Sequence, residues 1–214
     1  MIRLEGHVVV VTGAGSGLGT SCARLLGARG ATVVAAGDTA EAGTPDLATR
    51  AGCEALVAAV LDRHHRVDAL VHGGGDGVEA LWWLCRAVWP GMADRSYGRI
   101  VLTVPTAHGI GRAAQLGLLQ GLAGEGASRG VLVNAVSPGG LNPDDVAPRV
   151  VALVSPACPV TGAVLTGTGA ATTPEAVLAL LASPAAHGRT AADDAPLETE
   201  RHRFWGRLQQ ERDT

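Results

Sequence analysis

Short β-branched runs alternate with longer stretches of helical apolar spacing along most of the chain. The run from His7 to Val11 is typical of a strand buried on both faces of a parallel sheet. A helix is expected from Thr20 to Arg29, and Gly30 ends it before a strand at 31–36. Further strands are expected at 67–71, 99–104, 131–136 and 163–166, and further helices at 53–64, 78–92, 113–127 and 144–154.

This alternation predicts one α/β domain, a single Rossmann-like doubly wound parallel sheet of about six strands flanked by helices. A length of 214 residues suits one hydrophobic core. We expect this Rossmann domain over residues 1–169 and a partly helical C-terminal extension over 170–214. In the extension, we expect a helix to start at Thr173-Pro174-Glu175, and we expect a second, polar helix over residues 197–212.

A glycine-rich turn joins the first strand to the first helix and reads Thr12-Gly13-Ala14-Gly15-Ser16-Gly17-Leu18-Gly19. A dinucleotide pyrophosphate needs a tight turn, close backbone approach and free N–H groups at a helix start, which such a turn provides. Packing alone is the alternative explanation for these glycines. The candidate cofactor-binding residues are Gly13, Ser16, Gly17, Leu18 and Gly19.

Asp38 follows the second strand, at the distance from the glycines where an acid that binds ribose is expected. Its carboxylate would accept hydrogen bonds from the ribose hydroxyls and repel a 2′-phosphate. The expected cofactor is therefore NAD in preference to NADP. A solvated loop carboxylate is the other interpretation of Asp38.

The basic residues restrict the chemistry, because all 17 are arginine and the sequence contains no lysine. Tyr97 is the only tyrosine. A net charge of -3 and scattered arginines argue against a nucleic-acid partner. The sequence has neither a secretory signal nor an apolar run of about 18 residues, so we expect a cytoplasmic protein without membrane association. The four cysteines lack metal-ligand spacing, so we expect buried free thiols and no metal.

Several motifs resemble those of the short-chain dehydrogenase/reductase family. Thr12 to Gly19 matches the family's TGxxxGxG, and residues 98–101 are similar to its GRIV strand. Residues 129–139 resemble RGIRVNAVAPG and 159–162 resemble its VTG turn. Residues 124–127 and 155–162 further resemble the (3R)-hydroxyacyl-CoA dehydrogenase and ketoacyl reductase branch. The resemblance spans about residues 4 to 168 and implies an NAD(P) cofactor.

The family's catalytic helix carries a tyrosine as general acid/base and, four residues later, a lysine. By the family's spacing from Asn134, the tyrosine position falls on His108 and the lysine position on Arg112. Pro105 replaces the family's serine, with Thr106 as a nearby hydroxyl. The resemblance thus implies that the catalytic tyrosine, lysine and serine have all been replaced.

Other family positions have changed as well. The NNAG motif corresponds to His72-Gly73-Gly74-Gly75, and the catalytic asparagine to Gly77. Asp46 resembles the acid that contacts adenine, but too few residues precede it for the family's usual helix and third strand. The segment between Gly140 and Asp144 is also too short for the helices that cover substrate, so the resemblance implies a shallow or open pocket.

Two functions fit these replacements. The first is a degenerate family member that lacks ordinary dehydrogenase activity and acts as a partner or scaffold subunit. The resemblance implies pairing through two helices, as a homodimer, a homotetramer or a hetero-oligomer with an active family member. Core packing explains about half of the large apolar residues of these helices equally well. They are Trp82, Trp83, Trp89, Leu116, Leu118, Leu119 and Leu122.

The second is a reprogrammed enzyme in which His108 donates the proton and Arg112 supplies a fixed positive charge. His72, at the carboxyl end of a strand, and Thr106 complete the candidate catalytic set. Such a site would reduce a ketone of an acyl or polyketide-like substrate with NAD(P)H, or carry out a non-redox step without cofactor. A polar surface residue is the alternative for His108, and a loop histidine for His72.

Overall fold

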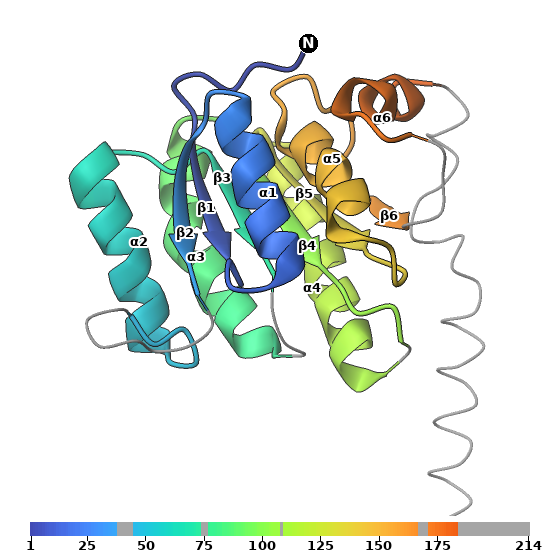
Figure 1. The fold of residues 1–214 in the computed structure, drawn as a ribbon. Helices are drawn as coiled ribbons and strands as arrows, with labels where there is room; N and C mark the ends of the chain where they lie inside the picture. Colours follow the sequence, from blue (N-terminus) through green and yellow to red (C-terminus); the bar gives the residue numbers. More distant parts are fainter. Residues whose placement is uncertain (38–44, 74–76, 108, 167–170, 184–214) are drawn as a thin grey trace, which may run out of the picture.

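The computed structural model describes residues 1–37, 45–73, 77–107, 109–166 and 171–183. Strands and helices alternate along these residues, as the sequence predicts (Figure 1). The strands are β1 (Val8–Thr12), β2 (Thr32–Ala36), β3 (Ala69–His72), β4 (Gly98–Thr103), β5 (Val131–Ser137) and β6 (Val164–Thr166). The helices are α1 (Gly17–Ala28), α2 (Arg50–His64), α3 (Val78–Asp94), α4 (Ile110–Ala127), α5 (Pro143–Val154) and α6 (Pro174–Leu181).

The strands form one parallel sheet in the order β2-β1-β3-β4-β5-β6. The predicted doubly wound Rossmann-like sheet is therefore confirmed. The parallel register places Thr12, the last residue of β1, directly beside His72, the last residue of β3. Because the strands are parallel, their carboxyl ends and the turns that follow them lie along one edge of the sheet.

The two faces of the sheet are covered by different sets of helices, with α1, α5 and α6 on one face and α2, α3 and α4 on the other (Figure 1). All five residues of β1 are buried, since its side chains alternate between these two layers. Val8 and Val10 pack with α2 and α3, whereas Val9 and Val11 pack with α1 and α5. The consecutive valines of the sequence thus reflect burial on both faces.

Polar caps start two helices before their expected first residues. The Ser16 side chain accepts a hydrogen bond from the N–H of Gly19, so α1 begins at Gly17 inside the glycine motif. The Thr49 side chain caps α2 in the same way. The apolar pattern does not predict these cap positions, because a cap uses a polar side chain that is not part of the buried face of the helix.

Helix α6 packs into the layer formed by α1 and α5, through Val177 and Leu181. The Glu175 carboxylate also accepts hydrogen bonds from the N–H of Ile2, at 2.8 Å, and from Arg29. The start of the predicted extension is therefore in contact with the core. The division at residue 170 stays a prediction, and the helix expected at 197–212 lies outside the described residues.

All four cysteines are buried free thiols, as the sequence predicts. Burial raises the pKa of Cys22 and of Cys85 to about 12, so neither forms a thiolate readily. In the part of the chain that the structure describes, no helix is both long enough and apolar enough to cross a membrane.

Candidate cofactor site at the carboxyl edge of the sheet

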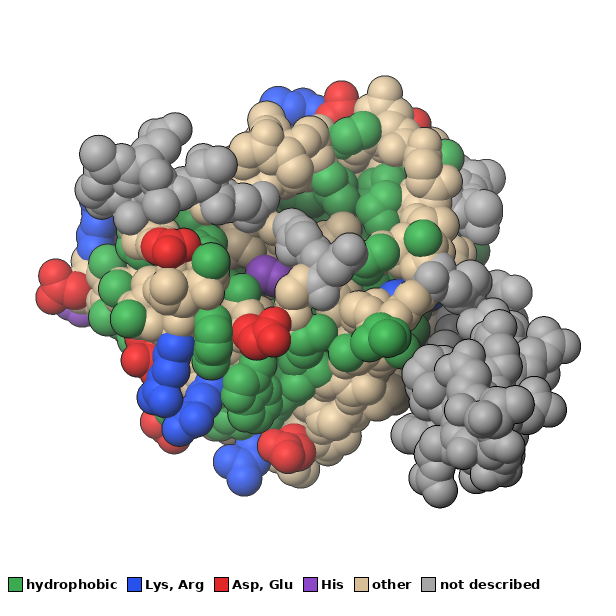
Figure 2. Space-filling view, turned by 90° about the horizontal axis from the view of Figure 1, so that it is seen from below, with side chains coloured by type: hydrophobic (Ala, Val, Ile, Leu, Met, Phe, Trp, Pro, Cys, Tyr) green, Lys and Arg blue, Asp and Glu red, His purple; other side chains and the backbone are tan. Residues whose placement is uncertain are grey.

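Most of the candidate residues follow the carboxyl ends of neighbouring strands, on the edge of the sheet that Figure 2 views from below. The glycine turn follows β1, and His72 ends β3. Thr106 comes shortly after β4, and Arg112 lies in the first turn of α4. Ligands of doubly wound sheets bind outside this edge, so the fold gathers the candidates where a ligand site is expected.

The glycine turn leaves no room for side chains at two of its positions. Gly13 has φ +67°, and a Cβ built on it would lie 1.8 Å from the carbonyl oxygen of Gly73. A Cβ on Gly19 would lie 2.1 Å from the carbonyl oxygen of Gly13. These glycines therefore let the turn pack against the end of β3 and against its own helix.

The amino end of α1 is free to accept an anion. Ser16 uses its hydroxyl within the turn, accepting from the N–H of Gly19 at 3.1 Å and donating to the carbonyl of Gly13 at 2.7 Å. The N–H groups of Gly17 and Leu18 have no acceptor among the described residues. The first turn of α1 contains no acidic residue. This end, with its free donors and the positive pole of the helix dipole, fits a phosphate group.

His72 is buried within the sheet and paired with the glycine motif. Its Nδ1 lies 2.8 Å from the hydroxyl oxygen of Thr12, the first residue of that motif. Its Nε2 is buried and has no hydrogen-bond partner in the described part of the chain. Burial lowers the pKa of His72 to about 4, so the ring is neutral at pH 7. The structure thus places His72 in the sheet and not in a loop, with one ring nitrogen unsatisfied.

Arg112 and Thr106 join the segments that follow β4 and β5. The Arg112 guanidinium donates to the carbonyl of Pro105, and the same nitrogen lies 3.4 Å from the hydroxyl oxygen of Ser137. The Thr106 hydroxyl accepts a hydrogen bond from the N–H of Gly139 at 2.9 Å. Both side chains therefore position backbone at this edge. His108, their proposed partner in catalysis, lies outside the described residues.

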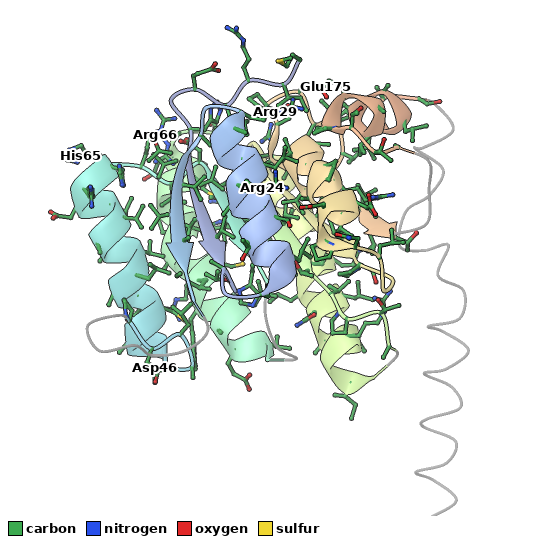
Figure 3. All side chains as sticks on the ribbon, in the orientation of Figure 1. Arg24, Arg29, Asp46, His65, Arg66 and Glu175 are labelled. Carbon is green, nitrogen blue, oxygen red and sulfur yellow. The ribbon has the colours of Figure 1, made fainter. Side chains whose placement is uncertain are left out.

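The side of the site expected to hold adenine is shortened. Among the residues that the structure describes, β2 is the outermost strand at this end of the sheet, and residues 45–49 lead into α2 without forming a strand. Asp46 lies just before the amino end of α2 (Figure 3). One of its carboxylate oxygens accepts a hydrogen bond from the N–H of Ala48 at 3.0 Å. Asp38 lies outside the described residues.

Sequence reasoning missed two residues of this edge. The sequence pattern assigns Thr12 only to the glycine motif, whereas its side chain contacts His72. Pro143 begins α5 and lies against the glycine turn, since a Cβ on Gly17 would be 3.2 Å from its ring. The only available signal was the short spacing from the Pro138-Gly139 turn to Asn142-Pro143, which starts α5 close to the strand end.

The only tyrosine lies at the opposite edge of the sheet. Tyr97 immediately precedes β4, and the Arg99 guanidinium carbon lies 4.5 Å from the centre of its ring. Burial raises the pKa of Tyr97, an effect that the nearby Arg99 opposes. Tyr97 is therefore separated from the glycine turn by the length of the strands.

A parallel sheet of this order with a glycine turn after β1 defines a dinucleotide-binding type of Rossmann domain. The family model of short chain dehydrogenases matches residues 7–80. The chain is 30% identical to 2,3-dihydroxy-2,3-dihydro-p-cumate dehydrogenase of Pseudomonas putida over 190 residues, covering 66% of this chain and 73% of that enzyme. The chain therefore belongs to the short-chain dehydrogenase/reductase family.

Other relatives agree with this assignment. The chain is 29% identical over 187 residues to 3-oxoacyl-(acyl-carrier-protein) reductase FabG of Vibrio cholerae, covering 67% of this chain and 77% of that reductase. A hydroxysteroid dehydrogenase structure from Escherichia coli shares the fold with a TM-score of 0.71 at 22% identity, covering 79% of this chain and 98% of that one. Because these names denote different substrates, a closer relation to the ketoacyl reductase branch stays a prediction.

Proposed function

We propose that this chain is a degenerate short-chain dehydrogenase/reductase that keeps a dinucleotide-binding glycine turn, lacks ordinary dehydrogenase activity and acts as a partner or scaffold subunit. A cytoplasmic location is part of this proposal. The family's hydride chemistry needs a tyrosine and a lysine at the carboxyl edge. This sequence has no lysine, and the position of Tyr97 at the amino edge is the observation that carries the proposal.

The cofactor part of the proposal rests on the amino end of α1. The free N–H groups of Gly17 and Leu18 would bind the pyrophosphate, and Gly13 and Gly19 would permit the close approach of the backbone. When bound, NAD(H) would supply the hydride-transfer chemistry of the family. With the Tyr/Lys pair replaced and the adenine side shortened, we expect binding that is weak and not followed by ordinary turnover.

The experiment that tests this is calorimetric titration of the full chain with NADH and NADPH, with native mass measured in parallel and dehydrogenase activity assayed on ketone and acyl substrates. We expect NADH binding without turnover, and a mass above that of one chain. A Gly17→Val variant should lose the binding, while Gly27→Val, at the open far end of the same helix, should retain it. Ordinary turnover with NADH or NADPH would refute the proposal.

We propose NAD in preference to NADP because the Asp38 carboxylate would repel a 2′-phosphate. Asp38→Ala should narrow the difference between the NADH and NADPH affinities, mainly by strengthening NADPH binding. An equal affinity for both cofactors in the unmodified protein would contradict this assignment.

The proposed partner surface lies on α3 and α4. Trp82 is 43% exposed, whereas Leu116, Leu119 and Leu122 are buried in the chain's own core. The exposed part of this surface, which also includes Ile110 at 80% exposure, is therefore what remains for a second subunit. Its occupant is a second copy of this chain or an active family member.

Native mass of surface variants tests this partner surface. Trp82→Asp should lower the observed mass to that of one chain, because a charge in an apolar interface is costly to desolvate. Leu61→Asp on α2 is the matched control, since Leu61 is 37% exposed and lies on another helix. An identical mass for both variants would place the interface elsewhere.

The second candidate function is a reprogrammed enzyme that uses His108 and Arg112, with His72 and Thr106 completing the candidate catalytic set. The observation that favours it is the position of Arg112 at the carboxyl edge, where its guanidinium reaches the hydroxyl of Ser137. In that case His108→Ala should abolish ketone reduction or a non-redox activity while leaving NADH affinity unchanged. Retained activity in His108→Ala would exclude this function.

A further inference from the structure

The amino ends of α1 and α5 lie next to each other at the carboxyl edge of the sheet. The two helices pack side by side on the same face (Figure 1). A Cβ built on Gly17 would lie 3.2 Å from Cγ and 4.0 Å from Cβ of Pro143. The first residue of α5 is therefore in contact with the first residue of the helix that is proposed to bind a pyrophosphate.

Polar contacts hold this arrangement one turn further along α1. The carboxylate of Asp144 accepts a hydrogen bond from the hydroxyl of Ser21 at 2.7 Å and another from Arg24 at 2.7 Å. These two bonds, that of Ser21 first, lower the pKa of Asp144. Asp144 is therefore ionised at pH 7 and neutralises Arg24, the arginine closest along α1 to the glycine turn.

The first turn of α5 has little to offer an anion. Pro143 has no N–H, and the N–H of Asp144 donates to the side chain of Asn142 at 3.0 Å. The N–H of Asp145 donates to the carbonyl of Asn142 at 2.9 Å. Of the two carboxylates in this first turn, that of Asp144 is the one bonded to α1. α5 therefore presents an apolar ring to the anion site of α1, and residues 143–145 offer it no free N–H group.

The backbone favours this placement because the chain reaches α5 quickly after β5. Gly139 and Gly140 both have positive φ, of 66° and 76°, and only Leu141 and Asn142 separate them from Pro143. The resulting tight turn leads straight from the strand end to the glycine turn of β1. No longer segment is available here to hold Pro143 away from Gly17.

We propose that the first turn of α5, through the ring of Pro143 and the carboxylate of Asp144, forms a wall beside the glycine turn that selects against the diphosphate of a dinucleotide. This inference rests on the dinucleotide-binding turn of the proposed function. The inference adds to that function the residues that limit the affinity of the glycine turn for NADH. The ring limits the space beside Gly17, and the carboxylate offsets the positive charge of Arg24 on α1.

The test is calorimetric titration of NADH into the full chain and two variants, with thermal unfolding to verify folding. Pro143→Ala should strengthen NADH binding severalfold, because it removes the ring and restores an N–H at the helix start. Asp144→Asn should strengthen NADH binding about fivefold, and more at low salt, because the positive charge of Arg24 is then no longer offset. The matched control is Asp145→Asn, which makes the same charge change without a side-chain bond to α1.

The outcomes separate this inference from the proposed function. Stronger binding in Pro143→Ala and Asp144→Asn, with Asp145→Asn within twofold of the unmodified chain, supports the wall. NADH binding that is unchanged or weaker in Pro143→Ala overturns the inference about Pro143 and Asp144, but it does not contradict the proposed dinucleotide binding at the glycine turn. Undetectable binding in the unmodified chain and in both variants overturns both.

Discussion

The two edges of the sheet differ in whether their polar groups have hydrogen-bond partners within the chain. At the amino edge, the fully buried Asp68 accepts hydrogen bonds from the N–H of Val8 at 2.8 Å and from the Arg66 guanidinium. Arg99 is 6% exposed and donates to the carbonyls of Gly98 and Pro156. The charges of this edge are bonded within the chain, so we assign them to stability.

At the carboxyl edge, polar groups lack such partners. The Nε2 atom of His72 and the N–H groups of Gly17 and Leu18 have no hydrogen-bond partner among the described residues. At the amino edge, the described residues include one buried side-chain group without a partner, the hydroxyl of Tyr97. Of the three groups at the carboxyl edge, the Nε2 atom of His72 is buried, whereas Gly17 is exposed and Leu18 is partly exposed. The two accessible N–H groups are donors that a ligand can reach, and they are what distinguishes the carboxyl edge from the amino edge.

The largest effect is expected at the amino edge. Asp68→Ala leaves the buried N–H of Val8 and the guanidinium of Arg66 without their acceptor, so it should lower the free energy of unfolding by about 4 kcal/mol. Urea unfolding measures this. NADH affinity of the folded variant should be unchanged. Asp62→Ala, at an exposed position on α2, should change stability little, and a comparable loss there would undermine the contrast between the edges.

A substitution in the glycine turn should affect both stability and binding. Gly13→Ala places a Cβ 1.8 Å from the carbonyl oxygen of Gly73 and imposes a side chain on a residue with φ +67°. We expect a loss of about 3 kcal/mol, from strain and overpacking together, and a loss of NADH binding. In the same turn, a Cβ on Gly15 meets nothing within 4 Å. Gly15→Ala should retain full stability, and equal losses in both variants would contradict this reading.

Lowering the pH should reduce the free energy of unfolding through the protonation of His72. Burial lowers its pKa from 6.5 to about 4, so the unfolded chain takes up a proton before the folded chain does. This contribution to stability is complete above pH 6.5 and is lost as the pH falls toward 4. Between pH 7 and pH 5 the loss amounts to about 2 kcal/mol.

Unfolding midpoints measured across this pH range test the contribution of His72. His72→Asn should remove this part of the pH dependence. His65→Asn is the control, because His65 is exposed at the end of α2 (Figure 3) with φ 62°, a conformation that asparagine tolerates. An unaltered pH dependence in His72→Asn would show that another group titrates.

The sequence predicts the fold well because its signals are local. The valines of β1, the glycines after them and the strand and helix alternation each depend on residues close in the chain, and the structure confirms the resulting sheet. Helix starts were less accurate, because polar caps such as Ser16 and Thr49 leave no trace in the apolar periodicity.

The site depends on contacts between distant segments, and these were not predictable. That His72 would be buried beside Thr12 follows from the register of β1 with β3. The contact of Pro143 with Gly17 depends on how α5 packs on α1. Arg99 is a signal within the sequence itself, since a charge inside the predominantly apolar strand Gly98–Thr103 needs bonded partners if it is buried.

The smallest predicted effect concerns an ion pair of intermediate exposure at the amino edge. Glu175 bonds Arg29 and the N–H of Ile2, and these bonds, that of Arg29 first, lower the pKa of Glu175 to about 2 (Figure 3). Because both side chains are partly solvated, Glu175→Gln should lower the free energy of unfolding by only about 1 kcal/mol. Urea unfolding at pH 7 measures this difference.

A second ion pair supplies the control for Glu175. Glu54 pairs with Arg50 within α2, where both side chains are about half exposed, so Glu54→Gln should cost only about 0.3 kcal/mol. The difference between the two variants then reports what partial burial and the additional bond to Ile2 contribute. Since Glu175 joins α6 to α1 and to the amino terminus, equal effects would mean that this contact does not secure α6. In that case the stabilising polar contacts of the amino edge would be those of Asp68 and Arg99, whose charged side chains are buried there.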